Sequence, residues 1–248
     1  KIYGLVAFVV LLFSFGGITF NLLESEVNKE TFYTTVYAEK GHISKIKLPD
    51  GSLVWLNSGS KLTYSNHFAN KHRQINLSGE GYFDVFKNEK LPFIVNCDDL
   101  KIKALGTEFN ISAYQEDETI HVVLEEGLVE ISSTLKKDFE TRLQPDEMGS
   151  FDRINSNFMV SSVDAESYIS WKDGIINIQN ESMEDVARRL ERKYNKSIEL
   201  LPEVKKLNLT LTIKNETLDE IISILEKVAP VKARKYEDRI VFSMRSDD

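Results

Sequence analysis

The sequence has a single cysteine among its 248 residues, so an internal disulfide cannot form. This residue, Cys97, follows Phe93 and Val95 at every second position, the spacing that places side chains on one face of a strand. We therefore expect a buried thiol that packs as a small hydrophobic group. The lack of disulfides does not fix the compartment, because proteins of the cell envelope can also lack them.

An excess of positive charge is missing as well. The chain carries 31 basic and 39 acidic residues, which gives a formal net charge of -8. Because binding to phosphate groups requires a basic surface, this balance argues against nucleic acid as a partner. Hydrophobic residues make up 42% of the chain and charged residues 28%, as in an ordinary folded protein.

Motifs that carry catalysis are not found. The sequence contains no Gly-x-Ser-x-Gly, no His-Glu-x-x-His and no phosphate-binding P-loop. Its histidines have no carboxylate or cysteine at metal-ligand spacing; they are His42, His67, His72 and His121. We expect a protein that is not an enzyme, with no catalytic, metal-binding or cofactor-binding residues.

Charge is absent from residues 2–23. At about 1.5 Å rise per residue, a helix of this length crosses the roughly 30 Å hydrocarbon core of a bilayer. A cleaved signal peptide is the alternative, but this apolar run is longer than such a region usually is and no clear Ala-x-Ala site follows. We expect a single transmembrane helix at 2–23 and a polar periplasmic tether at 24–36. Lys1 before the span favours a cytoplasmic N-terminus, which puts the rest of the chain in the periplasm.

Long amphipathic helices are missing from residues 37–163. Short alternating runs such as 53–56, 93–97 and 120–124 are separated by turn signals about every ten residues. Gly79 and Gly81 indicate a turn or bulge between strands. The pattern predicts an all-β domain over residues 37–163, either a sandwich, a barrel or a solenoid-like coil, with a sandwich or solenoid-like fold preferred.

The C-terminal part contains a repeat. Residues 176–191 and 211–226 align without a gap at an offset of 35, with identical residues at five positions. Each copy continues from a strand into an amphipathic helix, whose expected N-caps are Ser182 and Thr217. We predict a small α/β domain at 167–248, built from two β-α-β repeats with both helices on one face of a small sheet.

Five phrases in the β region stand out: Leu48–Ser60, Leu77–Val85, Pro92–Val95, Leu105–Tyr114 and Leu124–Ile131. Together, in this order, they resemble the FecR family of membrane-anchored anti-sigma regulators, and the combination is specific. From Tyr168–Gly174 onward the chain resembles the C-terminal module of such regulators in Bacteroidetes. That module is similar to the short N-terminal domain of secretins and TonB-dependent transducers, which also has two β-α-β repeats.

The resemblance implies a relay at the bacterial inner membrane. The signalling domain of a TonB-dependent outer-membrane transducer would engage the periplasmic C-terminal region. The regulator would then pass the signal to an extracytoplasmic-function sigma factor. In that family the segment that binds sigma lies N-terminal to the membrane helix, and this chain does not contain it.

Two strands could accept a partner strand at an open sheet edge. The candidate partner-binding residues are Leu207, Leu209, Leu211, Ile213, Ile240 and Phe242. The leucines at 207, 209 and 211 are equally explained as core residues. Two other functions stay open: a periplasmic structural or secretion-linked protein that self-assembles through the repeat, and an envelope enzyme with paired carboxylates in a cleft.

Overall fold

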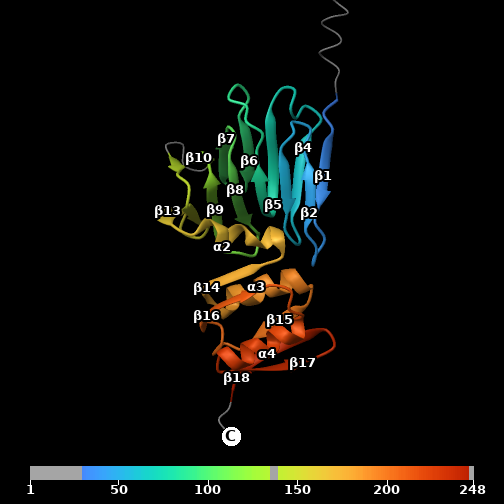
Figure 1. Ribbon diagram of the computed structural model, residues 1–248, viewed down its shortest axis with the longest axis vertical. Coiled ribbons are helices and arrows are strands. Elements are labelled where there is room, and N and C mark those ends of the chain that lie inside the picture. The colour runs from blue at the N-terminus through green and yellow to red at the C-terminus, as the bar shows by residue number, and fades with distance from the viewer. Residues whose placement is uncertain (1–29, 135–138, 246–248) are drawn as a thin grey trace, which may run out of the picture. The chain divides into compact units, whose positions relative to one another are not determined.

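A computed structural model describes residues 30–134 and 139–245 (Figure 1). Strands dominate this part of the chain, and thirteen of them belong to one large, barrel-like sheet. Contacts divide the chain after Tyr33, and everything below concerns the second unit, residues 34–248. The strands of the large sheet are β1 (Tyr33–Tyr37), β2 (Ser44–Lys47), β3 (Leu53–Leu56), β4 (Lys61–Ser65), β5 (Arg73–Asp84), β6 (Phe93–Cys97), β7 (Leu100–Ala104), β8 (Glu108–Ala113), β9 (Thr119–Glu126), β10 (Val129–Ser133), β11 (Glu140–Leu143), β12 (Glu147–Asp152) and β13 (Asn157–Ser162).

The long strand β5 joins the two halves of this sheet. Its residues 73–78 pair with β4 and β6, whereas residues 79–84 pair with β3 and β8. The strand passes through Gly79, whose φ is +97°, at a point where a Cβ atom would lie 2.5 Å from Ser60 Oγ. Glycine is therefore required here both by the backbone conformation and by the close approach of Ser60. The prediction that Gly79 and Gly81 form a turn or bulge between strands was wrong, because both residues lie inside the single strand β5.

The core of the large sheet follows the alternation of the sequence. In β6, Phe93, Val95 and Cys97 are buried while Ile94 and Asn96 between them are only partly buried. The expectation that Cys97 packs as a buried residue is confirmed. Burial in this apolar setting raises the pKa of the Cys97 thiol to about 12, so the thiol stays protonated and unreactive at neutral pH.

The remaining elements follow the large sheet in the chain. They are helix α2 (Ala165–Ile169), the 3-10 helix η1 (Ser170–Asp173), β14 (Ile176–Ser182), α3 (Met183–Tyr194), β15 (Ser197–Leu200), β16 (Asn208–Ile213), α4 (Leu218–Val228), β17 (Val231–Lys235) and β18 (Arg239–Met244). Helix α2 contacts β9 of the large sheet and also β14, so it connects the two groups of strands (Figure 1).

Both helices start as the sequence predicted. The Ser182 side chain accepts a hydrogen bond from the Asp185 backbone N–H at the start of α3. Thr217 and Glu220 form the complete capping box at the start of α4. The apolar stripes then bury Met183, Val186 and Leu190 of α3 and Ile221, Ile222 and Leu225 of α4 in one shared core.

The predicted fold class was wrong. The described residues form mainly strand, in a large barrel-like sheet that replaces the expected sandwich or solenoid-like domain. None of the described helices is long and apolar enough to span a membrane, and the span predicted at 2–23 lies outside the described residues. The domain boundaries drawn from the sequence stay predictions.

The expected pair of β-α-β repeats is also replaced by another arrangement. The first strands of the two copies, β14 and β16, pair with each other, while β15 and β17 flank β18 in a separate three-stranded sheet. The sequence pattern identified these strands and helices, but it could not show that β14 pairs with β16 and β15 with β18, across the two repeats. Hydrophobic periodicity predicts which face of a strand or helix is buried, but it does not predict which strand lies next to it.

Candidate functional site

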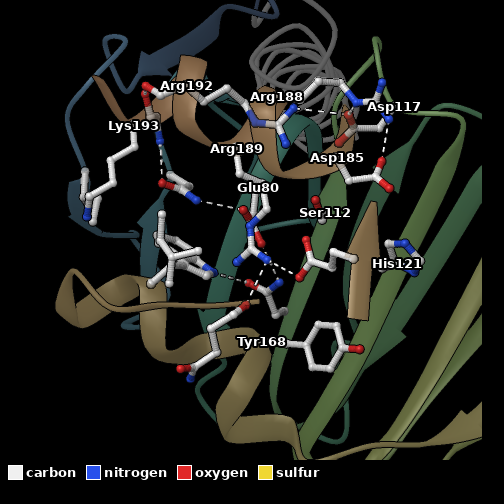
Figure 2. A pocket seen from close by; sticks show the side chains of 18 of the residues that line it. Glu80, Ser112, Asp117, His121, Tyr168, Asp185, Arg188, Arg189, Arg192 and Lys193 are labelled. Carbon is white, nitrogen blue, oxygen red and sulfur yellow. Dashed lines mark hydrogen bonds and ion pairs between the residues drawn. The ribbon is translucent and has the colours of Figure 1, made fainter. Parts of the chain in front are cut away.

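A cavity of about 560 Å³ lies between the large sheet and the elements around α3 (Figure 2). One wall comes from β5, β8 and β9, and the opposite wall from α2, β14 and α3. Its volume is within the range of pockets that hold small molecules, roughly 300–1,000 Å³. We treat this cavity as the candidate functional site.

The carboxylate of Glu80, on β5, is held in the wall by two amide side chains. Asn57 Nδ2 donates to Glu80 Oε2 over 2.7 Å, and Asn110 Nδ2 donates to Glu80 Oε1 over 3.0 Å. The oxygens of both amides are occupied: Asn57 Oδ1 accepts from the Ser58 backbone N–H, and Asn110 Oδ1 accepts from Trp171 Nε1. Both amides must therefore present N–H groups, and Glu80 must supply two acceptors.

Burial raises the pKa of Glu80 above its ordinary value of 4.5, because the surrounding protein disfavours the charged carboxylate. The hydrogen bonds from Asn110 and Asn57 oppose this shift, as do the positive charges of Arg189 and Arg192, without cancelling it. A raised pKa means that the folded state binds this proton more tightly than the unfolded chain. The contribution of Glu80 to stability is therefore largest below about pH 4.5 and declines as the pH rises through the folded-state pKa.

Replacing Glu80 by glutamine is expected to destabilise the protein by about 1–3 kcal/mol, because the new amide places an N–H group against one of the two fixed donors. The loss should be greater at pH 4.5 than at pH 7.5, since the substitution removes a group that stabilises the acidic form. Urea unfolding of both proteins across this range measures the difference. An equal loss at every pH would contradict the assignment of the raised pKa to Glu80.

Helix α3 supplies three arginines to the cavity wall. Its buried stripe packs inward, so the residues between the stripe positions face the large sheet and solvent. Arg192 is the most enclosed of the three, with a side chain 15% exposed, and its guanidinium lies 3.9 Å from the centre of the Tyr114 ring. The same arginine forms ion pairs with Glu116 and Asp117, each at 3.2 Å.

The backbone of α3 is attached to the sheet at the same point. The carbonyl oxygen of Arg192 accepts hydrogen bonds from Ser58 Oγ at 2.5 Å and from the Gly41 backbone N–H at 3.1 Å. Arg188 reaches the sheet through Asp117, with Nε 3.2 Å from Oδ1. Main-chain and side-chain contacts therefore both connect the end of α3 to the strands of the large sheet.

The positive charges of this wall are neutralised locally. Arg188 also pairs with Asp185, at 2.5 Å, while Arg189 Nη1 lies 2.5 Å from Glu181 Oε1 and donates to the Asn177 carbonyl oxygen at 3.0 Å (Figure 2). Each arginine thus has a carboxylate partner. The cavity contains charged groups without offering a surplus of one sign.

A second buried cluster lies beside the cavity, where Trp171 packs with Tyr82 and Ile169. The Tyr82 hydroxyl oxygen is 2.5 Å from Glu108 Oε2 and 2.6 Å from Glu125 Oε2. The hydroxyl group therefore lies between two carboxyl groups, from β8 and β9. Burial and the two carboxyl groups raise the pKa of Tyr82 and keep it protonated.

The partner-binding residues predicted from the sequence lie elsewhere, around the core shared by α3 and α4. Leu209, Ile213, Ile240 and Phe242 are buried in this core, and Leu207 and Leu211 pack against it. Strand β18 is paired on both sides, by β15 and β17, whereas β16 pairs only with β14 among the described strands. Binding of a partner by these residues stays a prediction.

The residues of the cavity were missed by the sequence analysis. Glu80 sits between two glycines that were assigned to a turn, and its partners Asn57 and Asn110 are 23 and 30 residues away. The four histidines do not gather: among the described residues no three or more His, Cys, Asp or Glu side chains are placed to hold a metal ion. His121 lines the cavity, where its Nδ1 is 3.0 Å from Ser150 Oγ and burial lowers its pKa.

Comparison with known proteins identifies two segments. Residues 34–130 match the family profile described as FecR protein, and residues 175–242 match the profile described as FecR, C-terminal. Among curated proteins, none matches the chain.

The chain is also similar to solved structures. Two crystal structures of a proposed anti-sigma factor from Parabacteroides distasonis, at 2.50 Å and 1.65 Å, each share 30% sequence identity with it. Each superposes with a TM-score of 0.80 and is covered over 100% of its own length, which corresponds to 87% and 86% of this chain.

Proposed function

The chain belongs to the FecR protein family, and from this premise we propose that it is an anti-sigma regulator, a signalling protein and not an enzyme. Its most specific support is the similarity over the full length of the Parabacteroides anti-sigma factor, which includes both the large sheet and the elements around α3 and α4. A protein of this kind acts by binding a sigma factor.

We extend this proposal to a relay at the bacterial inner membrane. The signalling domain of a TonB-dependent outer-membrane transducer would bind the periplasmic C-terminal region, and the protein would pass the signal to an extracytoplasmic-function sigma factor. The contacts of Arg192 with Ser58, Gly41 and Asp117 support this extension. A partner that moves α3 would also move strands of the large sheet through these bonds.

Crosslinking in the protein's own cells, followed by mass spectrometry on the tagged full-length protein, tests the proposal. We expect both a sigma factor and a TonB-dependent transducer among the crosslinked proteins. Recovery of neither, with crosslinks mainly between copies of the protein, would overturn the proposal in favour of a self-assembling periplasmic protein.

A charge-reversed variant tests whether α3 takes part in the relay. Arg188→Glu combined with Arg192→Glu places negative charges against Asp117 and should separate α3 from the turn between β8 and β9. We expect the transducer to be recovered while sigma-dependent transcription no longer responds to it. Arg142→Glu is the matched control, because its side chain is 60% exposed on β11. If sigma-dependent transcription in the double variant still responds to the transducer, α3 does not take part in the relay.

A further inference from the structure

Three hydroxyl groups in the cavity wall have no hydrogen-bond partner within residues 30–134 and 139–245. They belong to Ser112 on β8, Thr119 on β9 and Tyr168 on α2. Figure 2 labels Ser112 and Tyr168 among the side chains that line the cavity. Tyr168 is 37% exposed, and Ser112 and Thr119 are partly buried, so these hydroxyl groups are open to the water or ligand that fills the cavity.

His121 adds a fourth group with free hydrogen-bonding capacity. Its Nδ1 contacts Ser150 Oγ, which leaves Nε2 without a partner among the described residues. Because this imidazole is enclosed in the sheet, it is neutral and not a cation at pH 7. Ser112 and His121 are cross-strand neighbours in the pairing of β8 with β9, so their free groups lie side by side.

The ion pairs of helix α3 disfavour an ionic ligand at its arginines. Each of the arginines at 188, 189 and 192 has a carboxylate partner, and Lys193 Nζ donates to the Gly174 carbonyl oxygen over 2.9 Å. Glu80 is held by two amide donors. An anion that binds these arginines would have to displace a carboxylate, and a cation that binds Asp117, Glu181 or Asp185 would have to displace an arginine.

The wall also offers flat apolar surface from the ring of Tyr168, which is 37% exposed, beside the buried Trp171. A few separated polar groups beside aromatic rings are typical of small-molecule pockets. Free hydroxyl groups and a neutral imidazole both donate and accept, so they suit a ligand that carries several hydroxyl groups of its own.

We propose that this cavity binds a small uncharged polyhydroxylated molecule, of the size of a simple sugar or polyol. The ligand would touch β8 and β9 on one side and α2 on the other, and would hold the large sheet and the following elements together. This inference goes beyond the anti-sigma role and does not rest on it, because the role concerns protein partners only.

Tryptophan fluorescence gives a direct test. The chain has two tryptophans, so Trp55→Phe leaves Trp171, in the cavity wall, as the sole reporter. The probes are D-glucose, its anionic relative D-gluconate and its cationic relative D-glucosamine. We expect glucose to produce a saturable change with a millimolar dissociation constant, and the two charged probes to bind at least about tenfold more weakly. Calorimetry on the unsubstituted protein repeats the titration without relying on the Trp55 substitution.

Two hydroxyl deletions locate the binding site. Ser112→Ala and Tyr168→Phe each remove one free hydroxyl, and each should weaken glucose binding by about fivefold or more. Both variants should keep the unfolding midpoint, because neither hydroxyl makes a hydrogen bond within the described residues. Tyr236→Phe, on a tyrosine that is 51% exposed and outside the cavity, should bind glucose normally.

The proposal is overturned by any of three results. The first is no saturable signal with glucose up to about 100 mM in either assay. The second is binding of gluconate or glucosamine as tight as that of glucose. The third is unchanged glucose affinity in both the Ser112 and the Tyr168 variants, which would place the binding site elsewhere.

Discussion

Replacing Trp171 by alanine is expected to lower the free energy of unfolding by about 3–5 kcal/mol. The side chain is 4% exposed, packs with Tyr82 and Ile169, and donates from Nε1 to Asn110 Oδ1 over 3.1 Å. Removing it opens a cavity between η1 and the large sheet and leaves the Asn110 oxygen without a donor. That oxygen also fixes the orientation of the amide that holds Glu80.

Trp171→Phe separates packing from hydrogen bonding. Phenylalanine keeps much of the ring volume but lacks the N–H group, so we expect a loss of about 1–3 kcal/mol from the unpaired Asn110 oxygen. Urea unfolding of the unsubstituted protein and the two Trp171 variants measures these losses, provided that the dependence of the unfolding free energy on urea concentration is the same in all three. A loss below about 1 kcal/mol in Trp171→Ala would show that the sheet and η1 are not held together by this residue.

Replacing Arg73 by methionine is expected to destabilise the protein by a similar amount, about 3–5 kcal/mol. Its side chain is 1% exposed and lies 3.1 Å from Asp50, which is itself 6% exposed. Its guanidinium also donates to three backbone carbonyl oxygens, those of Phe86, Asn88 and Leu91. The substitution leaves the three carbonyl oxygens without this donor and removes the counter-charge of the buried Asp50 carboxylate, which keeps only its hydrogen bonds from Ser52.

The double variant Arg73→Met with Asp50→Asn identifies the source of the loss. Removing the buried charge should recover part of the stability, and the difference between the single and double variants gives the coupling of the pair. Arg142→Met is the matched control, because an exposed ion pair with Glu130 contributes at most about 1 kcal/mol. No recovery in the double variant would mean that the carbonyl oxygens, and not Asp50, dominate the loss.

Local features of the fold were predictable because they depend on neighbouring residues. The caps at Ser182 and Thr217 and the burial of Cys97 follow from patterns a few residues long. The identity of the family was also within reach, since the phrases that carry it are short and ordered. In each case the residues that determine the feature lie within a few positions of one another in the sequence.

The arrangement of the strands was not predictable in the same way. Strand β5 pairs with four other strands, and the alternation of its residues says only which side chains point inward. The candidate site could not be predicted for a related reason. Its residues come together only after β3, β5, β8 and η1 have packed; they are Glu80, Asn57, Asn110 and Trp171. A polar residue inside an alternating strand, flanked by glycines, is the one local sign that Glu80 was unusual.

Strand pairing across the repeat limits where this region can be truncated. One copy by itself would expose the edges of β14 and β15, because their partners β16 and β18 come from the second half of the region. We therefore expect a fragment that ends before β16 to associate with other chains through its unpaired strand edges.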